Sequence, residues 1–148
     1  MPSFVKRLGE KSQQNIFLAK DDAFISSNTI YIASDNCEFV LTSQGVKFHI
    51  TQKQNAHFNP DINHLFFSAL PLIGRYKLLP ILLTGIGDDG VNGCSALAQQ
   101  GVQCIAESEK TAIVYGIPAR AKERVQAVQI KDLDEIISLI HTFGATDV

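Results

Sequence analysis

The sequence predicts an α/β fold of the doubly wound, three-layer type, with a mostly parallel sheet and a β-hairpin insertion. From residue 78 onward, short apolar runs alternate with helical patterns in the order β-α-β-α-β-α, which implies parallel strands joined by right-handed crossovers. The apolar run 78–83 enters a glycine-rich turn and then a helix over 91–100, where α/β proteins place their chemistry. Segments 37–41 and 46–51 flank a short loop containing glycine, which indicates the hairpin.

Length and composition favour one domain over residues 1–148. The chain has 148 residues, of which 45% are hydrophobic and 19% charged, as in ordinary globular folds. A net charge of -2 and a pI near 6.0 indicate no nucleic-acid partner, so we interpret the cluster Arg120, Lys122, Arg124 as a solvated helix face. No apolar run approaches the ~20 residues that span a bilayer, and no leader is visible, so we expect no membrane insertion.

The cysteines argue against a metal site. There are three, and none forms a C-x-x-C pair; the three are Cys37, Cys94 and Cys104. An odd number without ligand spacing predicts neither zinc nor a disulfide framework, and it favours a reducing cytoplasm. We therefore expect no metal and no cofactor, with Cys94 and Cys104 serving as core residues.

The first half of the chain predicts a helix followed by strands. Ser3 suits the N-cap of a helix over 4–11, and because the chain begins almost on this helix we expect a domain truncated at its N-terminus. Residues 29–33 (T-I-Y-I-A) predict a strand. In the hairpin, apolar and polar residues alternate, so one face is expected to be buried, and its residues are Val46, Phe48 and Ile50.

The second half predicts alternating helices and strands. The expected elements are a helix from Pro60 to Ala69, strands over 78–83, 102–106 and 127–130, helices over 91–100 and 118–124, and a last helix over 133–143. Asp132 suits the N-cap of the last helix, and Gly101 ends the helix that follows the glycine turn. The inward face of the last helix is predicted to hold Leu133, Ile136, Ile137 and Ile140.

The glycine turn matches a dinucleotide-binding pattern. Gly85, Gly87 and Gly90 fit G-x-G-x-x-G between a strand and a helix, and Glu107 ends the next strand where such folds place a ribose-binding acid. Two carboxylates, Asp88 and Asp89, argue against this interpretation. Like charges ~4 Å apart repel by roughly 4 kcal/mol at an effective dielectric of 20. That is comparable to or larger than the gain of about 0.3–2 kcal/mol from a helix N-terminus.

The same turn allows two other interpretations. One aspartate can be a fixed carboxylate that orients a histidine, since a rigid glycine turn with backbone N–H groups would keep it ionised. Alternatively, Asp89 can cap the helix that follows and take no part in chemistry. The residues alone leave both open.

Several segments resemble one enzyme family. The turn T-G-I-G-D-D-G-V-N-G resembles the T-G-M-G-x-D-G-x-x-G signature of the chemotaxis protein-glutamate methylesterases. The segments S-F-x-x-R-L from Ser3, Y-I-A from Tyr31, N-P-D-I-N-H-L-F-F-S from Asn59 and A-E-S-E-K-T-A-I-V-Y-G-I-P from Ala106 also resemble segments of that family. Their order and approximate spacing are kept over nearly the whole chain.

The resemblance implies an ester hydrolase with a doubly wound fold. Enzymes of this family hydrolyse γ-glutamyl methyl esters on the cytoplasmic helices of methylated chemoreceptors, release methanol, and in many cases deamidate receptor glutamines. By position, Asp89 matches the aspartate of a Ser-His-Asp triad. Gly85, Ile86 and Gly87 match the oxyanion loop, with Ile86 in place of a methionine whose backbone N–H lies at that site.

The chain departs from the family at the two other triad positions. The family's serine and histidine motifs precede the S-F-x-x-R-L helix, and this chain has no match for either. Only His57, in a polar loop, is a candidate stand-in; His49, His64 and His141 match no triad position, and Ser34 and Ile117 are smaller departures. We therefore predict negligible esterase activity for this chain alone, and self-association through the face left by the missing N-terminal unit. A non-catalytic receptor-binding relative is the alternative.

Overall fold

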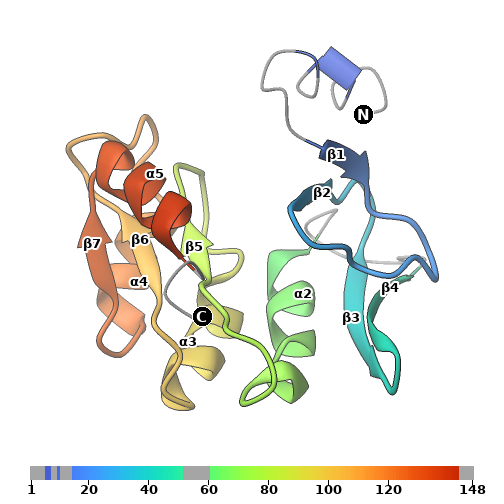
Figure 1. The fold of residues 1–148 in the computed structure, drawn as a ribbon. Helices are drawn as coiled ribbons and strands as arrows, with labels where there is room; N and C mark the ends of the chain where they lie inside the picture. The colour runs from blue at the N-terminus through green and yellow to red at the C-terminus, as the bar shows by residue number, and fades with distance from the viewer. Residues whose placement is uncertain (1–5, 8–9, 11–14, 52–60, 144–148) are drawn as a thin grey trace.

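The computed structural model describes residues 6–7, 10, 15–51 and 61–143 (Figure 1). The elements are the strands β1 (Asn15–Leu18), β2 (Thr29–Ile32), β3 (Cys37–Thr42), β4 (Gly45–Ile50), β5 (Ile81–Leu82), β6 (Ile105–Glu107) and β7 (Gln129–Lys131), and the helices α2 (Ile62–Ser68), α3 (Val91–Gln99), α4 (Ile117–Arg124) and α5 (Leu133–Thr142). A short 3-10 helix, η1 (Leu70–Leu72), follows α2. The predicted α/β class is confirmed.

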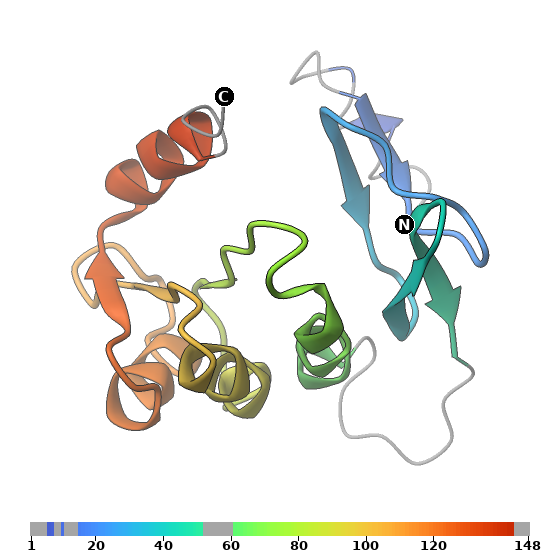
Figure 2. The same cartoon turned by 60° about the horizontal axis from the view of Figure 1, so that its bottom comes forward.

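The C-terminal half forms a three-stranded parallel sheet with the strand order β5-β6-β7. Ile81 is in register with Ile105, which is in register with Gln129. The helices α3 and α4 lie on one side of this sheet and α5 on the other, as Figures 1 and 2 both show. Right-handed crossovers between neighbouring parallel strands place their helices on the same face, which explains why α3 and α4 share one. The predicted β-α-β-α-β-α order is therefore confirmed.

The main core lies between this sheet and the helices α3 and α4. Its buried residues are Leu82, Val91, Cys94, Cys104, Ala106, Ile117, Ala121 and Val125. The three cysteines are free and buried, and the Cys104 thiol lies 3.5 Å from the carbonyl oxygen of Cys94. The prediction that Cys94 and Cys104 are core residues is confirmed.

The N-terminal half contains a parallel pair and a hairpin. Strands β1 and β2 are parallel, and β3 and β4 form the predicted antiparallel hairpin, with Thr42 opposite Gly45. Val46 and Phe48 are buried as expected, Ile50 is only half-buried, and the Phe48 ring packs edge-on against Tyr31. Within the described ranges the β1–β2 pair makes no ladder with β5–β6–β7, so the parallel strands lie in two separate pieces.

Helix α2 joins the hairpin to the C-terminal half. The backbone N–H of Phe39 in β3 donates to the Ser68 hydroxyl at 2.9 Å, and the other side of α2 packs against α3. The helix begins at Ile62 behind its N-cap Asp61, two residues after the predicted start; Pro60 lies outside the described residues. Asp61 accepts a hydrogen bond from the backbone N–H of His64, which satisfies one of the free N–H groups of the first turn.

Several predicted boundaries shift. The strand predicted over 78–83 is only two residues long, because Pro80 has no N–H to give to a ladder and its carbonyl alone binds Ile105. The next two strands each begin later than predicted, at Ile105 and Gln129. Of the helix predicted over 4–11, Lys6, Arg7 and Glu10 are helical, and the other residues lie outside the described ranges.

The predicted inward face of α5 is wrong. Asp132 caps the helix as expected and forms a capping box with Glu135. Of the four residues predicted to face inward only Ile136 is buried, while Leu133, Ile137 and Ile140 are 40%, 46% and 54% exposed. The apolar stripe of α5 is wider than the surface the described residues place against it, so most of the stripe faces solvent.

Candidate functional site

The glycine turn lies at the carboxyl end of β5 and is fixed by hydrogen bonds to the loop before α4. The backbone N–H of Gly85 donates to the carbonyl of Val114 at 3.0 Å. The carbonyl of Gly85 in turn accepts from the N–H groups of Gly116 and Ile117, at 3.1 and 2.8 Å. The Thr84 hydroxyl accepts from the N–H of Val114 at 2.7 Å. These bonds make the turn a rigid part of the fold.

Two glycines are required by the close approach of these segments. A Cβ atom on Gly116 would lie 2.5 Å from the carbonyl oxygen of Gly85 and 3.1 Å from Cα of Ile86. Gly87 has a φ of 88°, in the left-handed region that side chains rarely adopt. The conformation of the turn therefore depends on small residues at both positions.

The predicted oxyanion loop is exposed at the surface. The Gly85 N–H is used by Val114, so Gly85 contributes conformation to the site, not a donor. The N–H groups of Ile86 and Gly87 make no hydrogen bond to any described residue. Beside them is a hollow of about 280 Å³, lined by Gly87, Asp88, Gly116 and Arg120. Backbone donors at Ile86 and Gly87 are therefore available to a ligand.

Asp89 is buried and bridges two helices. Its side chain is 4% exposed, and its carboxylate accepts hydrogen bonds from the N–H groups of Ile62 at 3.0 Å and Asn63 at 3.3 Å. A second hydrogen bond links the two helices: the side-chain oxygen of Asn63 in α2 accepts from the N–H of Gly93 in α3 at 2.8 Å. Asp89 therefore caps α2, whereas the capping interpretation from sequence placed it on the helix that follows.

The pKa of Asp89 is raised above its usual value. Burial is the largest cause, because it disfavours the charged form. The two backbone N–H groups of α2 act in the opposite direction, and the neighbouring carboxyl of Asp61 raises the pKa further. The group thus combines a fixed geometry with an electrostatic environment that costs free energy to ionise, which is common at functional sites and also occurs in structural networks.

A second buried carboxylate supports the turn. Glu107, at the carboxyl end of β6, is 2% exposed. One of its oxygens accepts from the N–H of Thr84 at 2.9 Å, and the other accepts from the Thr111 hydroxyl at 2.9 Å. The sequence suggested Glu107 only as a ribose-binding acid. Its supporting role was missed because it depends on the register between β5 and β6.

With this geometry established, comparison with known proteins identifies the family. The family model described as CheB methylesterase matches residues 1–140. The chain belongs to this family.

Curated relatives agree. The chain is 33% identical to a protein-glutamate methylesterase/protein-glutamine glutaminase of Caldanaerobacter subterraneus subsp. tengcongensis, over 97% of this chain and 42% of that protein. It is 31% identical to one from Syntrophus aciditrophicus, over 93% of this chain and 39% of that protein. The chain therefore spans about two fifths of the length of these relatives.

A solved structure shows the same fold. The chain superposes on the Thermotoga maritima CheB methylesterase catalytic domain with a TM-score of 0.78 and 22% identity, over 94% of this chain and 75% of that one. A quarter of that catalytic domain thus has no counterpart in the present chain.

The dinucleotide interpretation finds no support from the CheB family match, and the fold argues against it. A pyrophosphate would have to reach the N-terminus of α3, where Gly90, Val91 and Gly93 are buried. A Cβ on Gly93 would lie 2.6 Å from Cβ of Phe66, which shows how closely α2 covers this helix end. The N–H of Val91 already donates to the carbonyl of Asp88. Helix α2 therefore occupies the place of the phosphate.

The described histidines lie away from Asp89. His49 in the hairpin lies 3.1 Å from Asp21, and His64 in α2 lies 3.2 Å from Glu38. His141 is exposed on α5, and His57 lies outside the described residues. In the ranges that the structure covers, no histidine bonds to Asp89.

The described part of the chain gives two further findings about possible sites. It contains no group of three His, Cys, Asp or Glu side chains able to hold a metal ion, and no helix long and apolar enough to cross a bilayer.

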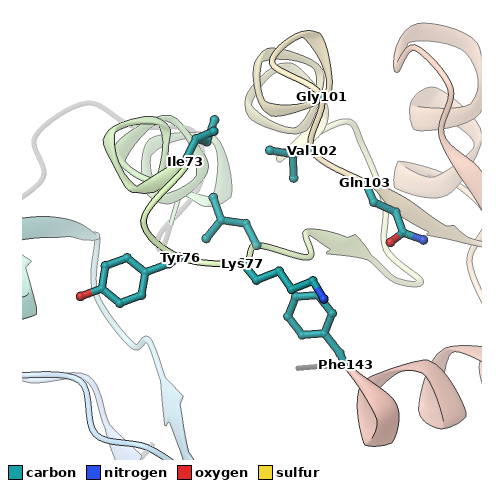
Figure 3. Close-up of a pocket in the computed structure, with 8 residues that line it drawn as sticks. Ile73, Tyr76, Lys77, Gly101, Val102, Gln103 and Phe143 are labelled. Atoms are coloured by element: carbon teal, nitrogen blue, oxygen red, sulfur yellow. The ribbon is translucent and has the colours of Figure 1, made fainter. Parts of the chain in front are cut away.

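A second hollow, of about 270 Å³, lies at the opposite, amino ends of β5 and β6 between Ile73, Val102 and Phe143 (Figure 3). Its distance from the turn along the strands separates it from the candidate site.

Proposed function

We propose that the glycine turn is the aspartate and oxyanion part of a site that hydrolyses γ-glutamyl methyl esters on chemoreceptors. The observation that carries the proposal is the burial of Asp89 in a hydrogen-bonded turn at the carboxyl end of β5, in a chain of the CheB methylesterase family. On this proposal the partner is the cytoplasmic helix of a methylated receptor, and the protein works in the cytoplasm.

The proposed reaction needs two groups besides Asp89. A serine hydroxyl attacks the ester carbonyl, a histidine takes its proton and delivers it to the leaving methanol, and water then releases the glutamate by the same route. Asp89 holds the imidazole in the tautomer that accepts the serine proton. The N–H groups of Ile86 and Gly87 stabilise the negative charge on the tetrahedral oxygen. Deamidation of a glutamine would follow the same steps with ammonia leaving.

The proposal is tested with a chimera. The N-terminal segment of the Thermotoga catalytic domain that carries the family's serine and histidine motifs is joined ahead of residue 1, and methanol release from methylated receptor is measured. We expect negligible release from this chain alone and clear release from the chimera. Asp89→Asn should lower kcat by about 10⁴-fold, as loss of the correct tautomer does in triads. Asp134→Asn, which changes an exposed carboxylate on α5 away from the turn, should leave kcat unchanged.

Two results would contradict this proposal. A folded chimera without activity would remove the esterase assignment. Robust methanol release by the isolated chain, abolished by Asp89→Ala, would show that the chain holds a complete site and that the missing motifs are not needed.

The non-catalytic alternative makes a different prediction. Both carboxylate oxygens of Asp89 already bind N–H groups of α2, so in this conformation Asp89 has a structural role without an imidazole. If this role is the whole of its function, immobilised receptor cytoplasmic domains should retain the protein, and neither the chain nor the chimera should release methanol.

A further inference from the structure

Apolar side chains are exposed at the carboxyl ends of β5 and β6. Ile113 and Ile86 are 90% and 84% exposed, more than any other large hydrophobic residue of the described chain. Val114 is about half exposed. We call these three residues the apolar ridge. Single exposed apolar residues are ordinary on protein surfaces, whereas a group of them beside a candidate site indicates a binding surface.

The ridge is built on a rigid support. Ile86 and Ile113 lie on the two loops that the Gly85, Thr84 and Val114 hydrogen bonds join, and the buried Glu107 carboxylate fixes Thr84 from below. Exposure of these side chains is therefore not a consequence of a loose loop. A surface already fixed in one conformation loses little entropy on binding, which favours affinity.

The hollow next to the ridge has a basic wall. Helix α4 carries three basic residues, Arg120, Lys122 and Arg124, and one acidic residue, Glu123. Arg124 pairs with Asp88 at 3.2 Å, and a guanidinium nitrogen of Arg120 lies 3.8 Å from Glu123. The Nε atom of Arg120 is buried and has no hydrogen-bond partner among the described residues. Arg120 lines the hollow and its side chain is 42% exposed, so an anionic side chain entering the hollow would meet a guanidinium cation.

We propose that the ridge and the hollow together bind an acidic amphipathic helix. Its apolar stripe lies on Ile113, Ile86 and their neighbours, and a glutamate one helical turn away enters the hollow and accepts a hydrogen bond from Arg120. Residues three or four positions apart share a helix face, so one helix can supply both groups. This inference rests on the proposed function, and it assigns to the receptor helix a second recognised group, a free glutamate beside the esterified one.

The test measures binding to this chain, separately from any turnover. The probe is a fluorescent helical peptide with an apolar stripe and glutamates at the i+3 and i+4 positions; the matched peptide has lysines there. We expect the glutamate peptide to bind at least about tenfold more tightly than the lysine peptide. Ile113→Ser should weaken its binding by about tenfold to a hundredfold, the worth of burying one such side chain.

Three further variants sharpen the test. Arg120→Met, which keeps the apolar stem, should remove the preference for glutamate over lysine, and Asp88→Asn should strengthen glutamate-peptide binding by removing a like charge from the hollow. Ile140→Ser, on the exposed stripe of α5, is the matched control and, at protein concentrations where the chain is monomeric, should leave the affinity for both peptides unchanged. Because Ile113 is almost fully exposed, its variant should unfold at the wild-type temperature.

Each contrary outcome has a definite meaning. Equal binding of the two peptides overturns the role of Arg120, and unchanged binding by Ile113→Ser overturns the ridge. Binding as expected with an inactive chimera would leave this surface intact while removing the esterase proposal. An active chimera whose peptide binding ignores Ile113 and Arg120 would remove this inference alone.

Discussion

The two faces of the β5–β6–β7 sheet differ in how completely they are covered. On the α3 and α4 face, Val91, Cys94 and Ala121 are fully buried and the core is continuous. On the opposite face, which α5 covers (Figure 2), Ile136 is buried, while Ile137 and Ile140 remain about half exposed. The first face holds the glycine turn and Asp89. The second face carries apolar surface that the described residues leave open.

The open face continues to the edge of the sheet. Strand β5 pairs only with β6 in the described part of the chain, and Pro80 directs its carbonyl to β6. Residues of a parallel strand alternate in direction, so the N–H and carbonyl groups of Ile81 and Leu83 face away from β6. Parallel sheets are normally buried on both faces. The described residues therefore cover the α3–α4 face of the sheet completely, whereas they leave the α5 face and the β5 edge partly open.

The largest expected difference between the two faces is in packing. Leu82→Ala removes a buried side chain from the α3–α4 core and should lower the free energy of unfolding by about 2–5 kcal/mol. Ile137→Ala removes a half-exposed side chain from α5 and should change it by about 0.5 kcal/mol or less. Chemical denaturation at low protein concentration measures both. Equal losses would show that the α5 face is as well covered as the other.

A smaller effect is expected on association. We predict that the chain self-associates through α5 and the β5 edge, because an unpaired edge beside an apolar stripe favours pairing with a second copy. Sedimentation over a range of concentrations should show oligomers. The double variant Ile137→Lys/Ile140→Lys should raise the dissociation constant about tenfold or more, since it places charges in the contact. A monodisperse wild-type monomer with a high unfolding midpoint would contradict the prediction.

The site end was also the part that local sequence rules predicted well. The strand, glycine turn and helix α3 follow from neighbouring residues, and Asp89 lies in the turn as expected. Its partners in α2 are 26 and 27 residues away, so no local rule could assign them. The stripe of α5 was assigned inward because amphipathic spacing shows which face is apolar, but not whether a neighbouring layer covers it. Glu107 was misread for a similar reason, since its burial depends on packing between strands.

The smallest expected effect is a pH dependence of the stability, which arises from Asp89 where its carboxylate caps α2. A carboxyl whose pKa is raised in the folded state binds its proton more tightly there than in the unfolded chain. Its stabilising contribution is therefore fully present below the unfolded value of about 3.9 and is lost as the pH rises through the folded pKa. Asp89→Asn cannot show this loss.

The free energy of unfolding is measured from pH 3 to 7 for the wild type and for Asp89→Asn. As the pH rises above about 4, the wild type should lose stability relative to the variant. A difference that stays constant over this range would mean that Asp89 ionises as easily in the folded protein as in the unfolded chain. The N–H groups of Ile62 and Asn63 would then balance the burial of the carboxylate and its repulsion by Asp61. In that case the turn would hold a charged carboxylate without cost, as a triad aspartate requires.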